Sequence, residues 1–82
     1  RLLGVSAFQN RDYRQAADAL AAESELTPEE GLMLAEARLQ LGERALGFQI
    51  LDEVTERWPE TAPRRAKRLS LERAYGRSNS AR

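Results

Sequence analysis

The stretch that decides the fold is Asp12-Tyr13-Arg14-Gln15-Ala16-Ala17-Asp18-Ala19-Leu20. Its apolar residues recur at steps of three and four, which is the spacing of one face of an α-helix. Asp12 stands where an N-cap residue accepts hydrogen bonds from the backbone of the first turn. Alanine favours the helix and lets a neighbouring helix approach closely. We therefore predict a helix that begins after Asp12, ends at Leu26 and packs tightly against its neighbours.

Four more helices are predicted around this one. Residues 2–10 carry apolar side chains at helical spacing. Thr27-Pro28-Glu29-Glu30 combines an N-cap threonine, a proline at the first helical position and a capping-box glutamate, so a helix runs from there to Leu41. Gly42 stands where a left-handed residue is needed at a helix end.

The next predicted helix covers residues 43–57, and Trp58-Pro59 stops it because the residue before a proline avoids helical geometry. Thr61-Ala62-Pro63 restarts the pattern, and a fifth helix covers residues 63–75. Residues 76–82 are small and polar and are expected to fray. No segment shows the alternation of a strand. The predicted fold class is all-α, in a single domain over residues 1–82.

Composition excludes most chemistry. The chain has 82 residues and neither cysteine nor histidine, so zinc sites of the usual kind and a histidine general base are excluded. No nucleotide-binding or nucleophile motif occurs. An acidic cluster at 23–30 is interpreted as a solvated helix end and not as a metal site. We expect no enzyme activity, no cofactor, no metal and no transmembrane segment. The start at Arg1, without a methionine, suggests a fragment of a longer protein.

The charges are unevenly distributed along a chain of zero formal net charge. Residues 1–61 hold twelve acidic residues and six arginines, whereas residues 62–82 hold seven basic residues and one glutamate. Four of those cations form a predicted basic patch at Arg64, Arg65, Lys67 and Arg68. This asymmetry is the main electrostatic feature of the sequence.

The chain repeats itself at an offset of about 31 residues, a fixed period that is typical of a helical solenoid. Small residues align with small ones and large apolar residues with large ones. The aligned pairs are Leu3 with Leu34, Gly4 with Ala35, Phe8 with Leu39, Asp12 with Glu43, Ala16 with Gly47, Leu20 with Leu51, and Pro28 with Pro59.

These residues resemble the tetratricopeptide repeat family, with Gly4 and Ala16 as the small residues of the two helices of a hairpin, Leu20 as the bulky one and Pro28 as the closing proline. The resemblance gives repeat one at 1–27, repeat two at 28–59, and a third-repeat or capping helix at 63–75. It implies a short right-handed solenoid of five helices. Two alignments of the third copy stay open, one pairing Pro28 with Pro63 and one pairing Ala37 with Ala74.

The family resemblance implies a non-catalytic scaffold for protein–protein interaction, part of a larger assembly, in which the first helix of each hairpin lines a concave groove. A partner peptide or helix would bind there. The groove positions would be Val5, Phe8, Gln9, Glu36, Leu39, Gln40, Arg73 and Arg77, with Leu32 and Leu69 beside them. Phe8 and Leu39 suit the groove and the core equally well, and Leu32 suits the core better.

The basic patch has several interpretations. Pairing within the protein, with Asp52, Glu53 or Glu56, is the simplest. A homo-oligomer, in which the acidic front of one copy meets the basic helix of another, is an alternative function. Binding of nucleic acid or an anionic surface through residues 64–77 is another, but we do not expect a nucleic-acid partner, because Tyr75 is the segment's one aromatic residue and no reader motif occurs.

Trp58 is the sole tryptophan, and we expect it to cover the junction between the second and third copies. The segment from Glu56 to Thr61 is similar in style to repeats of bacterial cell-envelope and secretion proteins. That style suggests a bacterial protein of the periplasm or of a membrane-associated complex, and a cytoplasmic location is equally open.

Overall fold

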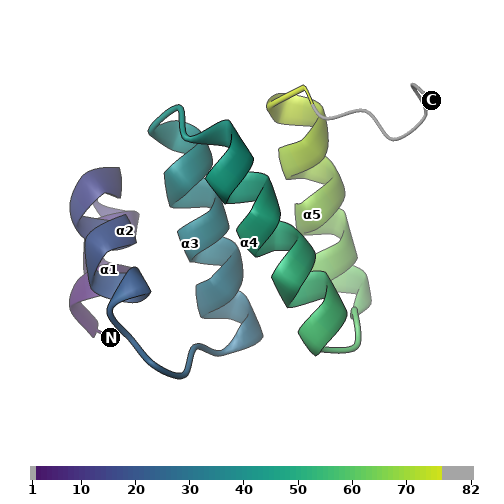
Figure 1. The fold of residues 1–82 in the computed structure, drawn as a ribbon, viewed down its shortest axis with the longest axis horizontal. Helices are drawn as coiled ribbons and strands as arrows, with labels where there is room; N and C mark the ends of the chain where they lie inside the picture. The colour runs from purple at the N-terminus through teal and green to yellow at the C-terminus, as the bar shows by residue number, and fades with distance from the viewer. Residues whose placement is uncertain (1, 77–82) are drawn as a thin grey trace.

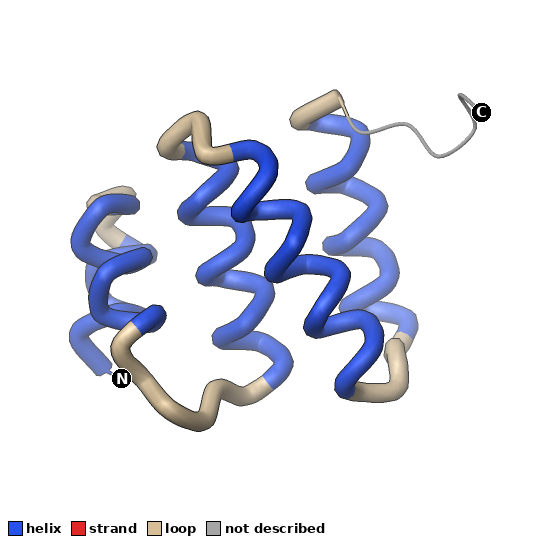
Figure 2. Tube along the Cα trace, viewed as in Figure 1, coloured by secondary structure: helices blue, strands red, loops and turns tan. Residues whose placement is uncertain are grey.

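Five helices in a row form the molecule, a computed structural model that describes residues 2–76 (Figures 1 and 2). They are α1 (Leu2–Gln9), α2 (Tyr13–Ala21), α3 (Pro28–Gln40), α4 (Arg44–Arg57) and α5 (Ala62–Ala74). The described residues contain no strand, so the predicted all-α class is confirmed. The row measures 38 × 26 × 18 Å, with the α1–α2 hairpin at one end and α5 at the other.

Local sequence signals fix most helix ends. The Asp12 side chain accepts a hydrogen bond from the backbone N–H of Gln15 at 3.3 Å and so caps α2. Thr27 and Glu30 form the predicted capping box at the start of α3, with hydrogen bonds of 2.9 and 3.1 Å. Gly42 adopts a φ of 84° just after α3, which is the left-handed conformation that glycine accepts most readily.

The predicted end of the second helix is wrong. The helix α2 ends at Ala21, and residues 22–27 form the connection to α3. The polar Glu23-Ser24-Glu25 offers no apolar side chain for another buried turn. Leu26 lies in the connection between α2 and α3, where it is half-buried and packs against the core. This leucine therefore contacts the core from the loop and not from α2.

The core consists of two clusters. One is built from α1, α2 and α3 and is dominated by small residues: Ala7, Ala16, Ala17, Leu20, Leu34 and Ala37. The other joins α3, α4 and α5 and holds larger ones: Leu32, Ala35, Leu39, Phe48, Leu51, Val54 and Leu71. Ile50 packs against both clusters. The helix α3 therefore lies between the two clusters and contributes to each.

Backbone geometry repeats at the offset seen in the sequence. Asp12 and Glu43, which are 31 residues apart, precede α2 and α4 with φ, ψ of −90°, 78° and −89°, 67°. The residues before them, Arg11 and Gly42, both have positive φ, 64° and 84°. The two turns thus have the same shape, although the Glu43 side chain makes no cap hydrogen bond.

The third copy follows the second at an offset of 34. The helices α3 and α5 each have 13 residues. The side chains of their N-cap residues, Thr27 and Thr61, each accept a hydrogen bond from the backbone N–H of the residue three positions later. Gly76 follows α5 with a φ of 81°, as Gly42 follows α3. Both sequence alignments of this copy are therefore off by one to three residues, because the prolines at 28 and 63 occupy different turn positions of their helices. Of the predicted tail 76–82, only Gly76 lies among the described residues.

Candidate binding groove

A surface hollow of about 410 Å³ lies where α1, α3 and α5 come together. These are the first, third and fifth helices of the row, so the hollow gathers side chains from three distant parts of the sequence. Its lining residues are Phe8, Glu29, Leu32, Met33, Glu36, Thr61, Pro63, Arg64 and Lys67. The floor is mostly apolar, and charged side chains lie at the edge.

Phe8 lines the hollow and contacts a second aromatic ring. The ring of Phe8 contacts that of Tyr13 edge-on, with centroids 5.7 Å apart and an interplanar angle of 77°. Burial raises the pKa of the Tyr75 phenol, and the negative charge of Glu36 raises it further. Tyr75 is therefore neutral at physiological pH and available as a hydrogen-bond donor.

An ion pair ties α3 to α5 within the hollow. Lys67 Nζ lies 2.7 Å from Glu36 Oε1, and the Glu36 side chain is only 16% exposed. Oε1 is shielded from solvent and accepts no well-aligned hydrogen bond from residues 2–76, so the Lys67 ammonium compensates its charge electrostatically. The pair fixes the spacing of the two helices at this point. It also leaves the Lys67 side chain 46% exposed at the hollow's edge.

The predicted groove residues divide into two groups. Phe8 and Glu36 line the hollow, and Phe8 is half-buried there. Val5 is half-buried, whereas Gln9 and Gln40 are exposed, and these three do not line it. Arg77 lies outside the described residues.

Leu39 belongs to the core. Its side chain is 3% exposed and packs against α4, where Gly47 approaches so closely that an added Cβ would lie 2.6 Å from Leu39 Cγ. A side chain enclosed in this way offers no surface to a partner, so we correct its assignment to the groove. Leu32 is also buried, at 7% exposure, and reaches only the inner edge of the hollow.

Arg73 and Leu69 do not reach the hollow either. With the offset of 34, they correspond to Leu39 and Ala35 of α3, which face α4. Because each residue advances a helix by about 100°, an error of one to three residues in register moves a side chain to another face. The residues of α5 that do line the hollow are Pro63, Arg64 and Lys67.

Sequence reasoning missed Met33, the apolar side chain at the centre of the hollow's α3 wall. The signal was present. Glu29, Met33 and Glu36 are spaced by four and three residues, so they share one face of α3. Leu32 and Leu39 share a different face of α3, which packs against α4. The helical period of the sequence is equally compatible with either face.

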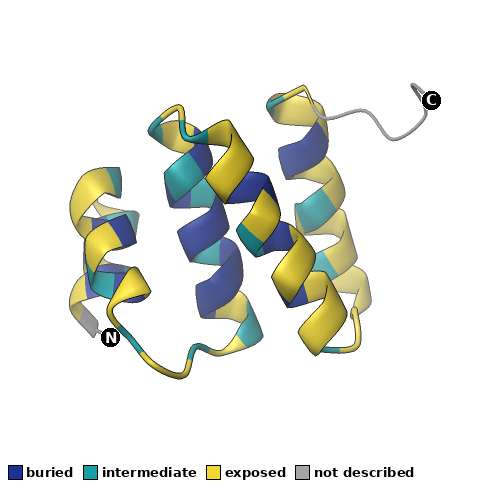
Figure 3. Cartoon of the chain, viewed as in Figure 1, coloured by how far each residue is buried: buried dark blue, intermediate teal, exposed yellow. Residues whose placement is uncertain are grey.

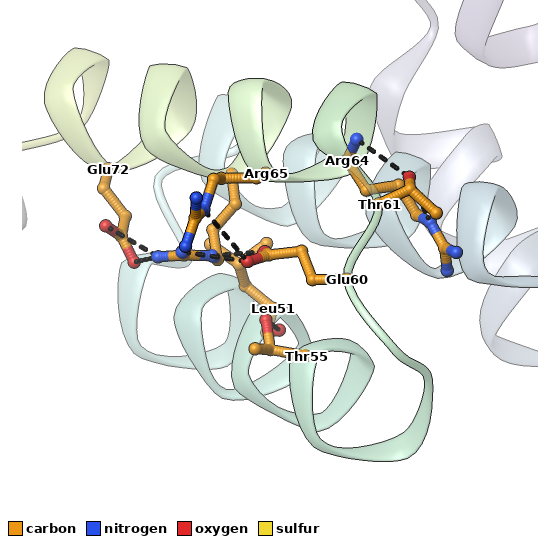
Figure 4. A network of polar contacts seen from close by, with 8 residues as sticks. Leu51, Thr55, Glu60, Thr61, Arg64, Arg65 and Glu72 are labelled. Carbon is orange, nitrogen blue, oxygen red and sulfur yellow. Dashed lines mark hydrogen bonds and ion pairs between the residues drawn. The ribbon is translucent and has the colours of Figure 1, made fainter.

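The predicted basic patch is largely neutralised by carboxylates (Figure 4). Arg68 donates from Nε to Glu60 Oε2 at 2.6 Å and from Nη2 to Glu60 Oε1 at 3.1 Å, a bidentate pair. Its Nη1 also lies 3.3 Å from Glu72 Oε2 on the next turn of α5. Arg68 therefore joins the α4–α5 connection to the buried side of α5.

The other patch members are arranged differently. Arg65 lies 3.8 Å from Glu60 and is 68% exposed, and Lys67 pairs with Glu36. Arg64 donates from Nε to Thr61 Oγ1 at 3.2 Å. Pairing within the protein is therefore confirmed, but the carboxylates are Glu36, Glu60 and Glu72 and not the expected ones of α4. The α5 helix packs against α3, where Lys67 pairs with Glu36. The Arg68 side chain of α5 pairs with Glu60 in the connection that precedes this helix.

Trp58 lies where we expected it. It packs half-buried against the cluster that joins α3, α4 and α5, and the Arg57 guanidinium stacks over its ring at 4.8 Å from the centroid. At the other end of α5, Arg44 donates to the carbonyl oxygens of Tyr75 and Gly76 at 2.8 and 3.1 Å. A cation at the C-terminal end of a helix is favoured by the helix dipole.

The Glu60 contact leads to a prediction on pH. The hydrogen bond from Arg68 holds the pKa of the Glu60 carboxyl below its ordinary value, and the nearby Arg65 and Arg64 charges add to this. A lowered pKa means that the pair contributes stability above the ordinary pKa, and that this is lost as pH falls through the folded-state pKa. Glu60→Gln should therefore lower the melting temperature at pH 7, and the difference from the wild type should shrink as the pH falls below the ordinary carboxyl pKa.

Thermal melts followed by circular dichroism between those pH values test this. Glu56→Gln is the control, because that carboxylate is exposed and makes no ion pair within residues 2–76. A gap between Glu60→Gln and the wild type that does not narrow between pH 7 and pH 3 would contradict the prediction.

Comparisons with protein-family models, with curated proteins and with solved structures found no match for this chain. Within residues 2–76, acidic side chains form no cluster of three or more that could hold a metal ion. None of the described helices has both the length and the apolar character to cross a membrane.

Proposed function

We propose that this chain is a non-catalytic scaffold of stacked helical hairpins, of the tetratricopeptide type, that binds a peptide or helix of a partner protein. The observation that carries the proposal is the hollow of about 410 Å³ between α1, α3 and α5. Ligand sites in proteins are typically concave and mostly apolar, with a few polar groups that orient the ligand. The hollow has this character.

The repeated backbone geometry supports the scaffold type. The period of 34 between α3 and α5 equals the length of a tetratricopeptide repeat. Two of the close helix contacts also agree with that type, because an added Cβ at Gly4 would lie 2.7 Å from Leu20, and one at Gly47 would lie 2.6 Å from Leu39. In a short right-handed solenoid, α1, α3 and α5 would be the helices of the concave side.

The lining residues indicate the chemistry of the ligand. Phe8, Met33 and Pro63 offer an apolar surface, on which a methionine can adapt its shape to the bound group. Arg64 makes no ion pair with a carboxylate in the described part of the chain, and it lies at the edge together with Lys67. We therefore expect a ligand that inserts one or two apolar side chains and carries a carboxylate beside them.

A peptide selected from a random display library against the wild-type chain supplies a defined probe. Met33→Glu should weaken its binding about tenfold or more, because a buried charge then faces the apolar side chain of the peptide. Leu46→Glu is the matched control, since Leu46 is 49% exposed on α4 and does not line the hollow. Titration calorimetry measures both affinities, and thermal melts verify that both variants fold.

Equal affinity of the two variants for the peptide would contradict the groove. So would a peptide whose binding shifts the amide resonances of α2 and α4 and leaves those of Phe8, Met33 and Lys67 unchanged in an NMR titration.

A further inference from the structure

One face of α5 lacks the cover that the matching face of α3 has. On α3, Leu32, Ala35 and Leu39 are at most 7% exposed because α4 packs on them. The corresponding residues of α5, at the offset of 34, are Ala66, Leu69 and Arg73. All three are exposed, and Leu69 has 45% of its surface accessible. Exposed residues predominate along α5 in Figure 3, whereas α3 is largely buried.

The opposite end of the row carries a second exposed feature. A hollow of about 510 Å³ lies on the outer side of the α1–α2 hairpin and is lined by Leu3, Asp12, Arg14, Gln15, Asp18 and Ala19. Leu3 is 57% exposed there, which is a large fraction for a leucine. The two ends lie at opposite sides of the molecule in Figure 1.

The charges at the two ends are complementary. At the α5 end, Arg73 makes no ion pair within residues 2–76, and Arg65 has only the 3.8 Å contact with Glu60. At the α1–α2 end, Asp18 makes no ion pair with any described residue. Arg14, the cation in that hollow, lies 3.6 Å from Glu43. The α5 end thus offers Arg73 and the weakly paired Arg65, and the α1–α2 end offers the carboxylates of Asp12 and Asp18.

We propose that a second copy of this chain occupies the exposed α5 face, head to tail, through its α1–α2 hollow. Leu69 of one copy enters the hollow and contacts Leu3 of the other. Arg65 pairs with Asp18, and Arg73 pairs with Asp12. The arginines lie about 12 Å apart along α5 and the aspartates about 9 Å apart along α2, a difference that long arginine side chains bridge.

This pairing sets α2 antiparallel to α5. The N-terminal end of α2 then lies near the C-terminal end of α5, which the helix dipoles favour. A symmetric pairing of two α5 helices is disfavoured, because Arg65 of each would face Arg73 of the other. A head-to-tail contact uses two different surfaces and generates an open chain of copies. The hollow between α1, α3 and α5 stays free, so this inference is independent of the peptide groove.

Sedimentation velocity of the wild-type chain, from about 10 µM to about 1 mM, tests the association. We expect the weight-average sedimentation coefficient to rise with concentration at low salt and to fall back in 1 M salt, where the Debye length is about 3 Å. A wild-type chain that stays monomeric across this range at low salt would overturn the proposal.

Charge reversals then identify the surfaces. We call the exposed α5 face the tail and the α1–α2 hollow the head. Arg65→Glu alters the tail and Asp18→Arg alters the head, and each should weaken self-association about tenfold or more. In an equimolar mixture of the two variants, every tail meets a head of opposite charge on the other variant, because the intact surfaces pair with each other and so do the two reversed ones. The mixture should therefore form chains in which the two variants alternate, although each variant alone associates weakly. The variant that carries both reversals should again form chains.

Two outcomes would overturn the proposal at this stage. Self-association of Asp18→Arg at wild-type affinity would point to a symmetric α5 contact, and a mixture that stays monomeric would exclude the head-to-tail contact. Circular dichroism verifies the fold of each variant. A mixture of Leu69→Glu and Leu3→Glu, two exposed positions outside the charge pairs, should form one-to-one dimers and nothing larger, because its two altered surfaces carry like charges and do not pair.

Discussion

Leu51→Ala is expected to reduce the free energy of unfolding by about 2–5 kcal/mol, the usual cost of removing a buried leucine side chain. Leu51 is fully buried, and it lies in the cluster that joins α3, α4 and α5. The substitution leaves a cavity that three helices border. A domain of this size has a total stability of about 5–10 kcal/mol, so the variant should lose a large share of it.

Thermal and urea unfolding followed by circular dichroism measure this loss. Each kcal/mol should lower the melting temperature by about 4–8 °C in a domain of this length. Leu46→Ala is the control on the same helix, since Leu46 is 49% exposed, and its effect should stay within about 0.5 kcal/mol. Equal stability of the two variants would contradict the assignment of Leu51 to the core.

Local signals in the sequence were sufficient to place most helices. The capping box at Thr27, the glycine at 42 and the proline at 59 act through the backbone of their own neighbourhood, so their effect is visible without the fold. The end of α2 was missed for the opposite reason. The helix ends at Ala21, and Leu26 packs from the connection against the cluster built from α1, α2 and α3. That packing is visible only when the three helices are placed together.

The candidate groove depended on information that periodicity does not contain. The pattern of α3 offers several faces, and only the position of α4 decides that Leu39 faces inward while Met33 faces the hollow. The carboxylate partners of Arg68 were missed for a similar reason. Glu60 lies in the connection before α5, and its distance from Arg68 is set by the path of that loop.

Gly47→Ala gives the second large expected effect, and the helix rule and the packing predict opposite signs for it. In an exposed helix interior, alanine is more favourable than glycine by about 1 kcal/mol. At Gly47, however, an added Cβ would lie 2.6 Å from Leu39 Cγ and 3.1 Å from the carbonyl oxygen of Ala35. Overpacking of this kind costs about 1–3 kcal/mol. We therefore expect Gly47→Ala to destabilise the fold by up to about 2 kcal/mol.

A double-mutant cycle with Leu39→Ala isolates that contact. Leu39→Ala removes the two leucine atoms that lie closest to the new Cβ and leaves the Ala35 carbonyl oxygen at 3.1 Å. Adding Gly47→Ala to Leu39→Ala should therefore cost clearly less than it does in the wild type, or stabilise the protein. Gly42→Ala is the matched control, because nothing lies within 4 Å of its added Cβ and its φ of 84° alone makes alanine unfavourable. Its cost should be the same with leucine or alanine at position 39. If Gly47→Ala is stabilising in the wild-type background, the close approach of α3 and α4 at this glycine is wrong.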